Sequence, residues 1–227
     1  MTVSTYPDPI INYDFKNIYP PSDDTYLILD YFNSNINNSF FDGIKTNMVK
    51  RILDLGTGTG IIAIFFQIIK KYNPNFNPEI YASDILEEAI TCAKLNAKIN
   101  NTEDKIRFLQ SNLFESFPNS LKNSFNIIIF NPPYLPSSRL IESKENIDYS
   151  WNGGEKGYEI IIKFLKIAPN FLNLNNPHYI YYISSSRTDL TELNKKVIKL
   201  GYKISIIKEH HIFFENIYLN KIKYDKH

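Results

Sequence analysis

RILDLGTGTG, residues 51–60, runs from an apolar strand into a glycine-rich turn, and an apolar helix, Ile61–Lys70, follows it. Glycines in such a turn let the backbone adopt tight conformations and let a ligand approach closely. The predicted strand is Arg51–Leu55, and open α/β sheets bind their ligands at the carboxyl ends of strands. The stretch therefore predicts an α/β fold with a ligand site beside the glycines.

Strands and helices keep alternating after this stretch. Repeated strand–helix units imply a parallel sheet with helices on both faces. Two β-rich stretches, 202–213 and 216–224, end the chain with no helix between them, so they predict an antiparallel hairpin at one edge. We therefore expect a Rossmann-like, seven-stranded, mostly parallel sheet. The other expected strands are Glu79–Ser83, Lys105–Leu109, Phe125–Phe130 and His178–Ile183, and the other expected helices are Leu86–Ile99, Glu155–Ala168 and Asp189–Leu200.

The N-terminal part of the chain precedes this alternating pattern. Ser22–Thr25 consists of helix-capping residue types and predicts a helix that runs to about Phe32. A polar loop is expected from there to about Met48. No linker or internal repeat divides the sequence, so we expect residues 1–227 to form a single domain in which residues 1–48 pack over the ligand site.

Composition limits the function classes. Hydrophobic residues make up 43% of the chain and charged residues 22%, which is an ordinary globular balance. No apolar run reaches the roughly 18 residues of a membrane span, and no signal peptide is visible, so we expect a soluble, cytoplasmic protein. Cys92 is the single cysteine, and the four histidines lack a metal-binding spacing, so we expect no metal. A net charge of +1 and scarce arginine give no sign of a nucleic-acid surface.

The spacing of the glycines indicates whether the ligand is a nicotinamide dinucleotide or a different molecule. A nicotinamide dinucleotide site requires Gly-x-Gly-x-x-Gly close to the N-terminus. Here Gly56, Gly58 and Gly60 are spaced Gly-x-Gly-x-Gly, Ile61 follows, and about 50 residues come before them. A different ligand is therefore favoured, and a tight turn without a ligand is the structural alternative.

Polar residues that suit such a ligand follow each predicted strand. Asp54 can accept a hydrogen bond from the cationic amino group of a methionine moiety, an interaction worth about 1.5–3 kcal/mol. Asp84 follows the second strand and can accept from both hydroxyls of a ribose; it is equally suited to cap the helix that begins near Leu86. Asn112 and Leu113 follow the third strand, where they can meet an adenine amine and cover its ring.

The most specific motif is Asn131-Pro132-Pro133-Tyr134, which follows an all-apolar strand. Each proline forces the residue before it into an extended conformation, and neither proline has an N–H group. The loop therefore presents two fixed acceptors, the Asn131 side-chain oxygen and the Pro132 carbonyl.

Two such acceptors fit a planar NH₂ group, whose delocalised lone pair makes it a poor nucleophile. Accepting both hydrogens orients the nitrogen and stabilises the positive charge that develops on it, while Tyr134 can stack on the planar group. These physical arguments select an NH₂ group without distinguishing glutamine from adenine. A surface β-turn is the structural alternative, because Asn-Pro commonly starts turns.

Six motifs together resemble those of the HemK-related protein glutamine methyltransferases. They are YPPSDDT at 19–25, DLGTGTG at 54–60, SDI at 83–85, NLF at 112–114, NPPY at 131–134 and WNGG at 151–154. The resemblance spans roughly residues 19–187 and is strongest to the short archaeal and eukaryotic branch. It implies a class I methyltransferase fold, S-adenosyl-L-methionine as cofactor, and N5-methylation of the glutamine in the Gly-Gly-Gln motif of class I translation release factors.

The resemblance also implies roles for individual residues. The loop at 131–134 is expected to act in catalysis through Asn131, Pro132 and Tyr134, and to hold the substrate through these three residues and Pro133. The family usually has Asp where this chain has Asn112, whose amide oxygen can still accept from an adenine amine, though without charge. Residues 151–154 are expected near the substrate entrance or, alternatively, as a loop leading into a helix. The expected cofactor-binding residues are Tyr19, Thr25, Asp54, Gly56, Gly58, Asp84, Asn112, Leu113 and Asn131.

A partner follows from the same resemblance. Members of this branch usually form a heterodimer with a small zinc-binding activator subunit, which would add to the edge formed by Lys105–Leu109. The main rival function is adenine-N6 methylation of RNA or DNA, since adenine also offers a planar NH₂ group. Near-neutral charge and the lack of a separate nucleic-acid module weigh against it. A non-catalytic cofactor-binding protein is a further alternative, although an intact catalytic loop would be superfluous in it.

Overall fold

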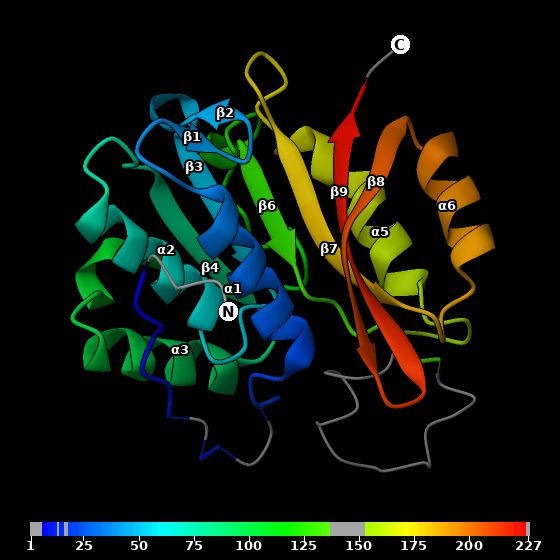
Figure 1. Ribbon diagram of the computed structural model, residues 1–227, viewed down its shortest axis with the longest axis horizontal. Coiled ribbons are helices and arrows are strands. Elements are labelled where there is room, and N and C mark those ends of the chain that lie inside the picture. The colour runs from blue at the N-terminus through cyan, green and yellow to red at the C-terminus, as the bar shows by residue number, and fades with distance from the viewer. Residues whose placement is uncertain (1–5, 13, 16–17, 137–152, 226–227) are drawn as a thin grey trace.

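The computed structural model describes residues 6–12, 14–15, 18–136 and 153–225, and a seven-stranded sheet forms its centre (Figure 1). The strand order is β5-β4-β3-β6-β7-β9-β8. The first five strands in this order are mutually parallel, and β9 pairs antiparallel with both β7 and β8. The predicted sheet and its antiparallel edge hairpin are confirmed. The strands are β3 (Arg51–Leu55), β4 (Glu79–Asp84), β5 (Ile106–Gln110), β6 (Ile127–Phe130), β7 (Tyr179–Ser185), β8 (Tyr202–Ile212) and β9 (Glu215–Tyr224).

Helices cover both faces of the sheet, as repeated strand–helix units require. One apolar core joins α1, α2 and α3 to one face, and a second joins α5 and α6 to the other. Strand β6 shows why its sequence is apolar throughout: Ile127 and Ile129 belong to the first core, and Ile128 and Phe130 to the second. The helices are α1 (Asp23–Asn35), α2 (Ile61–Tyr72), α3 (Glu87–Ile99), α5 (Glu159–Ile167) and α6 (Leu190–Lys199).

The segment after α1 differs from the predicted polar loop. It contains a small antiparallel hairpin of β1 (Phe40–Phe41) and β2 (Ile44–Lys45), and a short 3₁₀ helix, Thr46–Met48, follows. Asp42 and Gly43 form the turn with φ values of +43° and +83°. The neighbouring Phe41 and Ile44 are buried in the core, and this burial stabilises the hairpin. The loop prediction was therefore wrong for this segment.

Helix α5 begins later than the predicted Glu155. Gly154 and Gly157 take φ values of +102° and +80°, so the backbone forms a turn before the helix starts at Glu159. None of the helices in the described part of the chain combines the length and the apolarity needed to cross a lipid bilayer.

Candidate active site

A pocket opens at the carboxyl ends of β3, β4, β5 and β6, where four loops and the start of α1 meet. Segments far apart in the sequence contribute to its lining. All but one of the predicted site residues lie in this lining. These are Tyr19, Thr25, Gly56, Gly58, Asp84, Asn112, Leu113, Asn131, Pro132, Pro133 and Tyr134.

The glycine turn that follows β3 has the backbone that its sequence predicts. Gly56 and Gly58 take φ values of +67° and +52°, in the left-handed region that favours glycine. A Cβ added at Gly56 would lie 3.1 Å from the Phe130 ring, because the turn packs against the end of β6. The Gly58 N–H donates to Asp84 Oδ2 at 2.9 Å, which ties the turn to β4.

Asp54 is the predicted site residue that the pocket lining does not include. Its carboxylate is 1% exposed and lies beneath the turn, where Oδ2 accepts from the Thr57 hydroxyl at 2.6 Å and the Ala63 N–H at 3.2 Å. Oδ1 is buried and has no hydrogen-bond partner among the described residues. Burial raises the pKa of Asp54 from 3.8 to about 7. Asp54 thus supports the turn and retains one free acceptor atom.

Asp84 holds the start of α3 as well as the glycine turn. Its Oδ1 accepts from the Leu86 N–H at 3.0 Å, and Leu86 is the N-cap residue of α3. Burial raises the pKa of Asp84, while hydrogen bonds from backbone N–H groups, first that of Gly58, oppose the shift. Each carboxylate oxygen retains acceptor capacity, so the capping contact leaves room for a second partner.

The loop after β5 brings Asn112 and Leu113 into the pocket wall. Leu113 has a φ of +51°, an unusual value for a branched side chain and one that costs of order 1–2 kcal/mol. Such strain clusters at ligand sites. The Asn112 amide nitrogen donates to Glu115 Oε1 at 3.0 Å, so its oxygen is the atom left to accept.

Asn131 lies directly after β6 and has an oriented side-chain amide. Its Nδ2 donates to the Thr25 hydroxyl at 3.4 Å, which connects α1 to the loop Asn131–Tyr134, the predicted catalytic loop. Its Oδ1 is buried and has no hydrogen-bond partner in the described part of the chain. A buried acceptor without a partner costs about 1–3 kcal/mol, so this atom is suited to a donor that a bound molecule brings.

Asp24 is a buried residue of this site that sequence reasoning missed. It is 3% exposed and accepts from the Tyr134 hydroxyl at 3.0 Å and from the Thr25 N–H at 2.6 Å. The Tyr19 hydroxyl lies 3.5 Å from both carboxylate oxygens. The available signals were the pair Asp23-Asp24, which capping chemistry already explained, and its place in the motif at 19–25, to which no separate role of Asp24 was assigned.

The same contacts fix the protonation of the two tyrosines. Burial and the negative charge of Asp24 raise the pKa of Tyr19 to about 12. Burial and Asp24 also raise the pKa of Tyr134 well above its ordinary value. Both phenols therefore stay protonated at neutral pH, and neither is suited to act as a general base.

A glycine turn supports the catalytic loop from behind. The Gly153 N–H donates to the Leu135 carbonyl at 2.9 Å. A Cβ added at Gly153 would lie 2.7 Å from the Pro133 carbonyl oxygen, and one added at Gly157 would lie 2.5 Å from the Tyr134 carbonyl oxygen. Sequence reasoning had not identified Gly157. Of the predicted entrance residues, 151 and 152 lie outside the described residues, and the described glycines act as the lead-in to α5.

The arrangement suits transfer of a small electrophilic group to a planar nitrogen. The lining combines the Asn131 and Asn112 amides with Tyr19 and Tyr134, and Asp24 is bonded to the Tyr134 hydroxyl. No group of three or more His, Cys, Asp or Glu side chains among the described residues could hold a metal ion.

Comparison with known proteins gives the same class of chemistry. The family model described as methyltransferase small domain matches residues 37–143. A putative protein N5-glutamine methyltransferase of Methanocaldococcus jannaschii is 32% identical over 200 residues, which cover 88% of each chain. The mouse methyltransferase HEMK2 is 25% identical and covers 82% of this chain and 79% of its own.

Solved structures agree at the level of the fold. A chain of the Mtq2–Trm112 complex from E. cuniculi, which is responsible for methylation of the eRF1 translation termination factor, aligns with a TM-score of 0.59. It is 22% identical, and the alignment covers 92% of this chain and 100% of that chain. M. capricolum TrmK, solved with S-adenosyl-homocysteine, aligns with a TM-score of 0.54 and 19% identity, covering 88% of this chain and 68% of its own.

Proposed function

The chain belongs to the protein N5-glutamine methyltransferases, and we propose that it methylates the glutamine of the Gly-Gly-Gln motif in a class I translation release factor. The methyl donor is S-adenosyl-L-methionine, which supplies an electrophilic methyl group on a sulfonium. The observation that supports a planar NH₂ group as the acceptor is the buried, unpartnered Asn131 Oδ1 at the end of β6. The relatives named as protein glutamine methyltransferases support glutamine over adenine.

The chain's own residues account for the activation of the amide. Asn131 Oδ1 and the Pro132 carbonyl accept the two N–H hydrogens of the glutamine side chain, which turns the nitrogen toward the methyl group. Both dipoles stabilise the positive charge that develops on nitrogen, and they need no reorganisation during the reaction. The methylated nitrogen becomes acidic and loses its proton afterwards, so the chain needs no general base before transfer. Tyr134, held by Asp24 at 3.0 Å, stacks beside the amide.

The residues around the glycine turn fit the cofactor. Gly56 and Gly58 let the backbone approach it, and the free Oδ1 of Asp54 is the acceptor for its amino group. Asp84 accepts from the ribose. Leu113 would cover the adenine ring, and the Asn112 oxygen would accept from the adenine amine. Tyr19, Thr25 and Asn131 close the pocket around it.

Residues 1–227 act as one methyltransferase domain in this proposal, with residues 1–48 covering the cofactor site. The contacts of the N-terminal part support this arrangement. Asn12 exchanges two hydrogen bonds with the Asn96 side chain of α3, at 2.8 and 3.0 Å, and Asn96 also donates to the Thr59 carbonyl of the glycine turn at 2.9 Å. One side chain thus joins the N-terminal segment to the cofactor loop.

A small zinc-binding activator subunit is the proposed partner, and together the two chains form a heterodimer. Strand β5 is an edge strand, so its outer backbone groups are available for pairing. The E. cuniculi relative in fold was solved as a complex with Trm112, which supports a partner of this kind.

Mass spectrometry of the reacted release factor tests the function. The chain is purified together with its activator and incubated with labelled cofactor, a release-factor domain, RNA and DNA. The expected result is one added methyl group on the glutamine of the Gly-Gly-Gln motif. Label that enters adenine of RNA or DNA and leaves the glutamine unmodified would overturn the proposal in favour of adenine-N6 methylation.

A further inference from the structure

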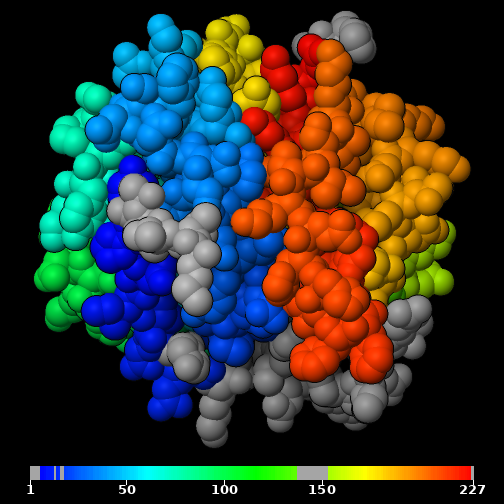
Figure 2. All heavy atoms as spheres, in the orientation of Figure 1, coloured from blue at the N-terminus to red at the C-terminus, as the bar shows by residue number. Residues whose placement is uncertain are grey.

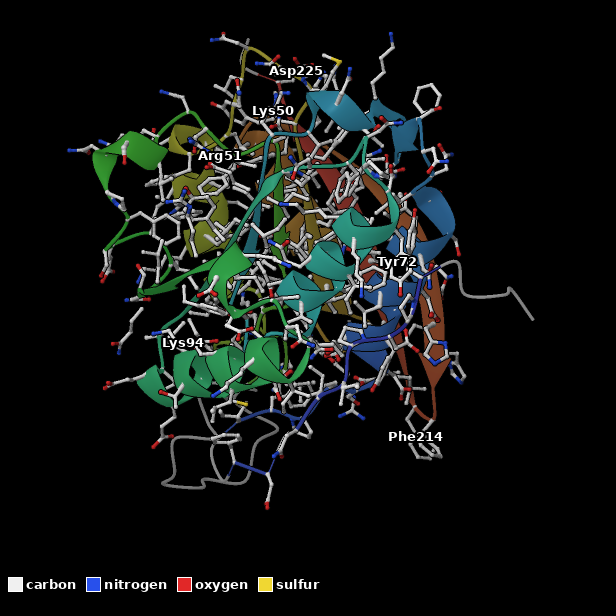
Figure 3. The ribbon with its side chains drawn as sticks, turned by 90° about the vertical axis from the view of Figure 1, so that its left-hand side faces the viewer. Lys50, Arg51, Tyr72, Lys94, Phe214 and Asp225 are labelled. Carbon is white, nitrogen blue, oxygen red and sulfur yellow. The ribbon has the colours of Figure 1, made fainter. Side chains whose placement is uncertain are left out.

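The turn between β8 and β9 carries two adjacent phenylalanines that the fold does not use. Phe213 and Phe214 are 88% and 90% exposed, the highest values among the large hydrophobic side chains of the described residues. Figure 3 shows Phe214 at the end of the hairpin, pointing away from the body of the molecule. Two large aromatic side chains side by side in water form an apolar surface that a protein partner can bury.

The backbone of this turn is also strained. Phe213 has a φ of +43°, and the connection between Ile212 and Glu215 is only two residues long. Such short hairpin connections favour Gly, Asn or Asp where φ is positive, and a bulky residue there is an outlier. The stability of the hairpin therefore does not account for an aromatic residue at this position.

The turn lies on the same side of the molecule as the pocket, where the parallel strands have their carboxyl ends. Strand β9 runs antiparallel to β7, and Ile217 pairs with Ser185, the last residue of β7. The turn that precedes β9 therefore projects beyond the carboxyl end of β7. The hairpin descends past the other strands to that edge in Figure 1, and in Figure 2 its atoms stand at the surface there.

Hydrogen bonds and an ion pair connect the base of the turn to the loop Asn131–Tyr134. Glu215 accepts from the Ser185 hydroxyl at 3.0 Å and pairs with Arg187 Nε at 2.9 Å. Thr188, one residue further along the same loop, donates to the Tyr134 carbonyl at 3.0 Å. The negative charge of Glu215 is one of the causes that raise the pKa of Tyr134. The turn that carries the phenylalanines is therefore connected, through Glu215 and the loop after β7, to Tyr134.

We propose that Phe213 and Phe214 dock the folded protein that carries the methyl-accepting glutamine, an inference that rests on the proposed function. They would insert into an apolar depression of the substrate domain and hold its glutamine loop over the pocket. Strand β8 is at the opposite end of the sheet from β5, so this surface is separate from the proposed activator edge. The exposed charges beside the turn are mixed, with Lys208 and Glu209 adjacent, which suits a protein surface better than a nucleic acid or an anionic membrane.

Paired substrates test the proposal. The double variant Phe213→Gly, Phe214→Ser is compared with the wild-type chain, each with its activator, on a folded release-factor domain and on a short peptide containing Gly-Gly-Gln. Glycine suits the positive φ at position 213, so the variant is expected to fold and melt no lower than the wild type. The KM for the domain is expected to rise about tenfold, while the KM for the peptide and the affinity for the cofactor stay unchanged.

Tyr72→Ser is the matched control, because Tyr72 is also an exposed aromatic residue, at 54%, but lies at the end of α2 that leads to the amino end of β4. It is expected to leave both KM values unchanged. An unchanged KM for the domain in the double variant would overturn docking. Loss of activator binding by the double variant would also overturn it, and so would a wild-type turn that binds lipid vesicles instead of the release-factor domain. A wild-type chain that methylates neither substrate would instead contradict the proposed function.

Discussion

The Asn131 side chain combines one oriented donor with one buried, unpartnered acceptor. Alanine at this position removes the acceptor and leaves the glycine turn intact. We therefore predict that Asn131→Ala still binds the cofactor, as measured by calorimetry, while kcat falls by about 10²–10³-fold, the usual effect of losing one preorganised dipole. Thr25→Val, which removes only the hydroxyl that orients the amide, is expected to lose less. Near-native turnover of Asn131→Ala would show that the loop does not activate the amide.

If Asp54 accepts from the cofactor's amino group, as we propose, cofactor binding depends on pH. Burial raises the pKa of Asp54 from 3.8 to about 7 in the folded chain. Between these two pH values the folded state therefore holds a proton on Asp54 that the unfolded state has lost. The stability contributed by this group is therefore lost as pH rises from about 4 to 7. A cation beside Oδ1 favours the ionised carboxylate.

The resulting prediction is proton release on binding. Below about pH 7 the cofactor should displace a proton from Asp54, and affinity should rise with pH until it levels off near that value. Calorimetry in buffers of different ionisation enthalpy measures the protons released. Asp54→Asn is the control and should release none from this site. Equal proton release by wild type and variant would contradict a direct role of Asp54 toward the amino group.

Sequence reasoning identified side chains whose chemistry follows from their position after a strand, such as Asn131 and Asp84. It did not identify Asp24, because this residue acts through its contact with Tyr134, 110 positions away in the chain. Nothing local in Ser22–Thr25 distinguishes a helix-capping aspartate from one that holds a tyrosine across the pocket. The contact predicted between Asp54 and the ligand stays a prediction: Oδ2 is held below the turn, and Oδ1 is buried without a hydrogen-bond partner among the described residues.

Among the elements, the turn before α5 tests whether the catalytic loop depends on its support. An added Cβ at Gly153 would lie 2.7 Å from the Pro133 carbonyl oxygen and 2.9 Å from the Tyr134 Cα. We predict that Gly153→Ala displaces the loop and lowers kcat about a hundredfold, as expected for a misplacement near 1 Å. Cofactor affinity should change little, because the glycine turn after β3 is not touched.

Gly43→Ala is the control for this variant. Gly43 has a φ of +83° and an added Cβ there would meet no atom within 4 Å, so the substitution costs about 1–2 kcal/mol of backbone strain without a clash. It should lower the melting temperature and leave kcat unchanged. If both variants lose activity in proportion to stability, the turn has no specific role in positioning the loop.

The hairpin that contains Gly43 shows where sequence patterns mislead. Asn and Ser residues between α1 and β3 gave the impression of a polar loop, yet Asp42-Gly43 lies between apolar residues, a strong local signal for a hairpin. Asp42 also makes part-buried contacts with Tyr31 and Lys221, at 2.8 Å each, and the pairing with Lys221 joins opposite ends of the chain and was not predictable. The turn could thus be predicted from the local sequence, whereas the tertiary contacts could not.

For the whole molecule, the mostly parallel sheet and its antiparallel edge hairpin followed from the sequence, because repeated strand–helix units leave few alternatives. The observed strand order places β5 and β8 at the edges. What the sequence could not establish is whether an edge is covered, because an exposed edge strand and a paired one have the same residues. The partner at β5 therefore requires a test on the assembled protein.

The test uses a backbone N–H group of β5 that points away from β4, toward the side where a partner strand would pair. The Ser111 N–H donates to the Asp84 carbonyl at 2.8 Å, and Gln110 pairs with Asp84 in register. Because alternate residues of a parallel strand face the same neighbour, the N–H of Gln110 faces outward. Proline is tolerated at such a position of an edge strand but cannot donate to an added strand.

We predict that Gln110→Pro leaves the sheet intact and weakens binding of the activator by at least about tenfold, since one outward hydrogen bond is lost and the added strand is displaced. Gln110→Ala, which removes the exposed side chain and keeps the N–H, should bind the activator as the wild type does. Co-purification and calorimetry measure both affinities, and circular dichroism checks the fold. Equal loss in the two variants would assign the effect to the side chain, and no loss in either would place the activator away from β5.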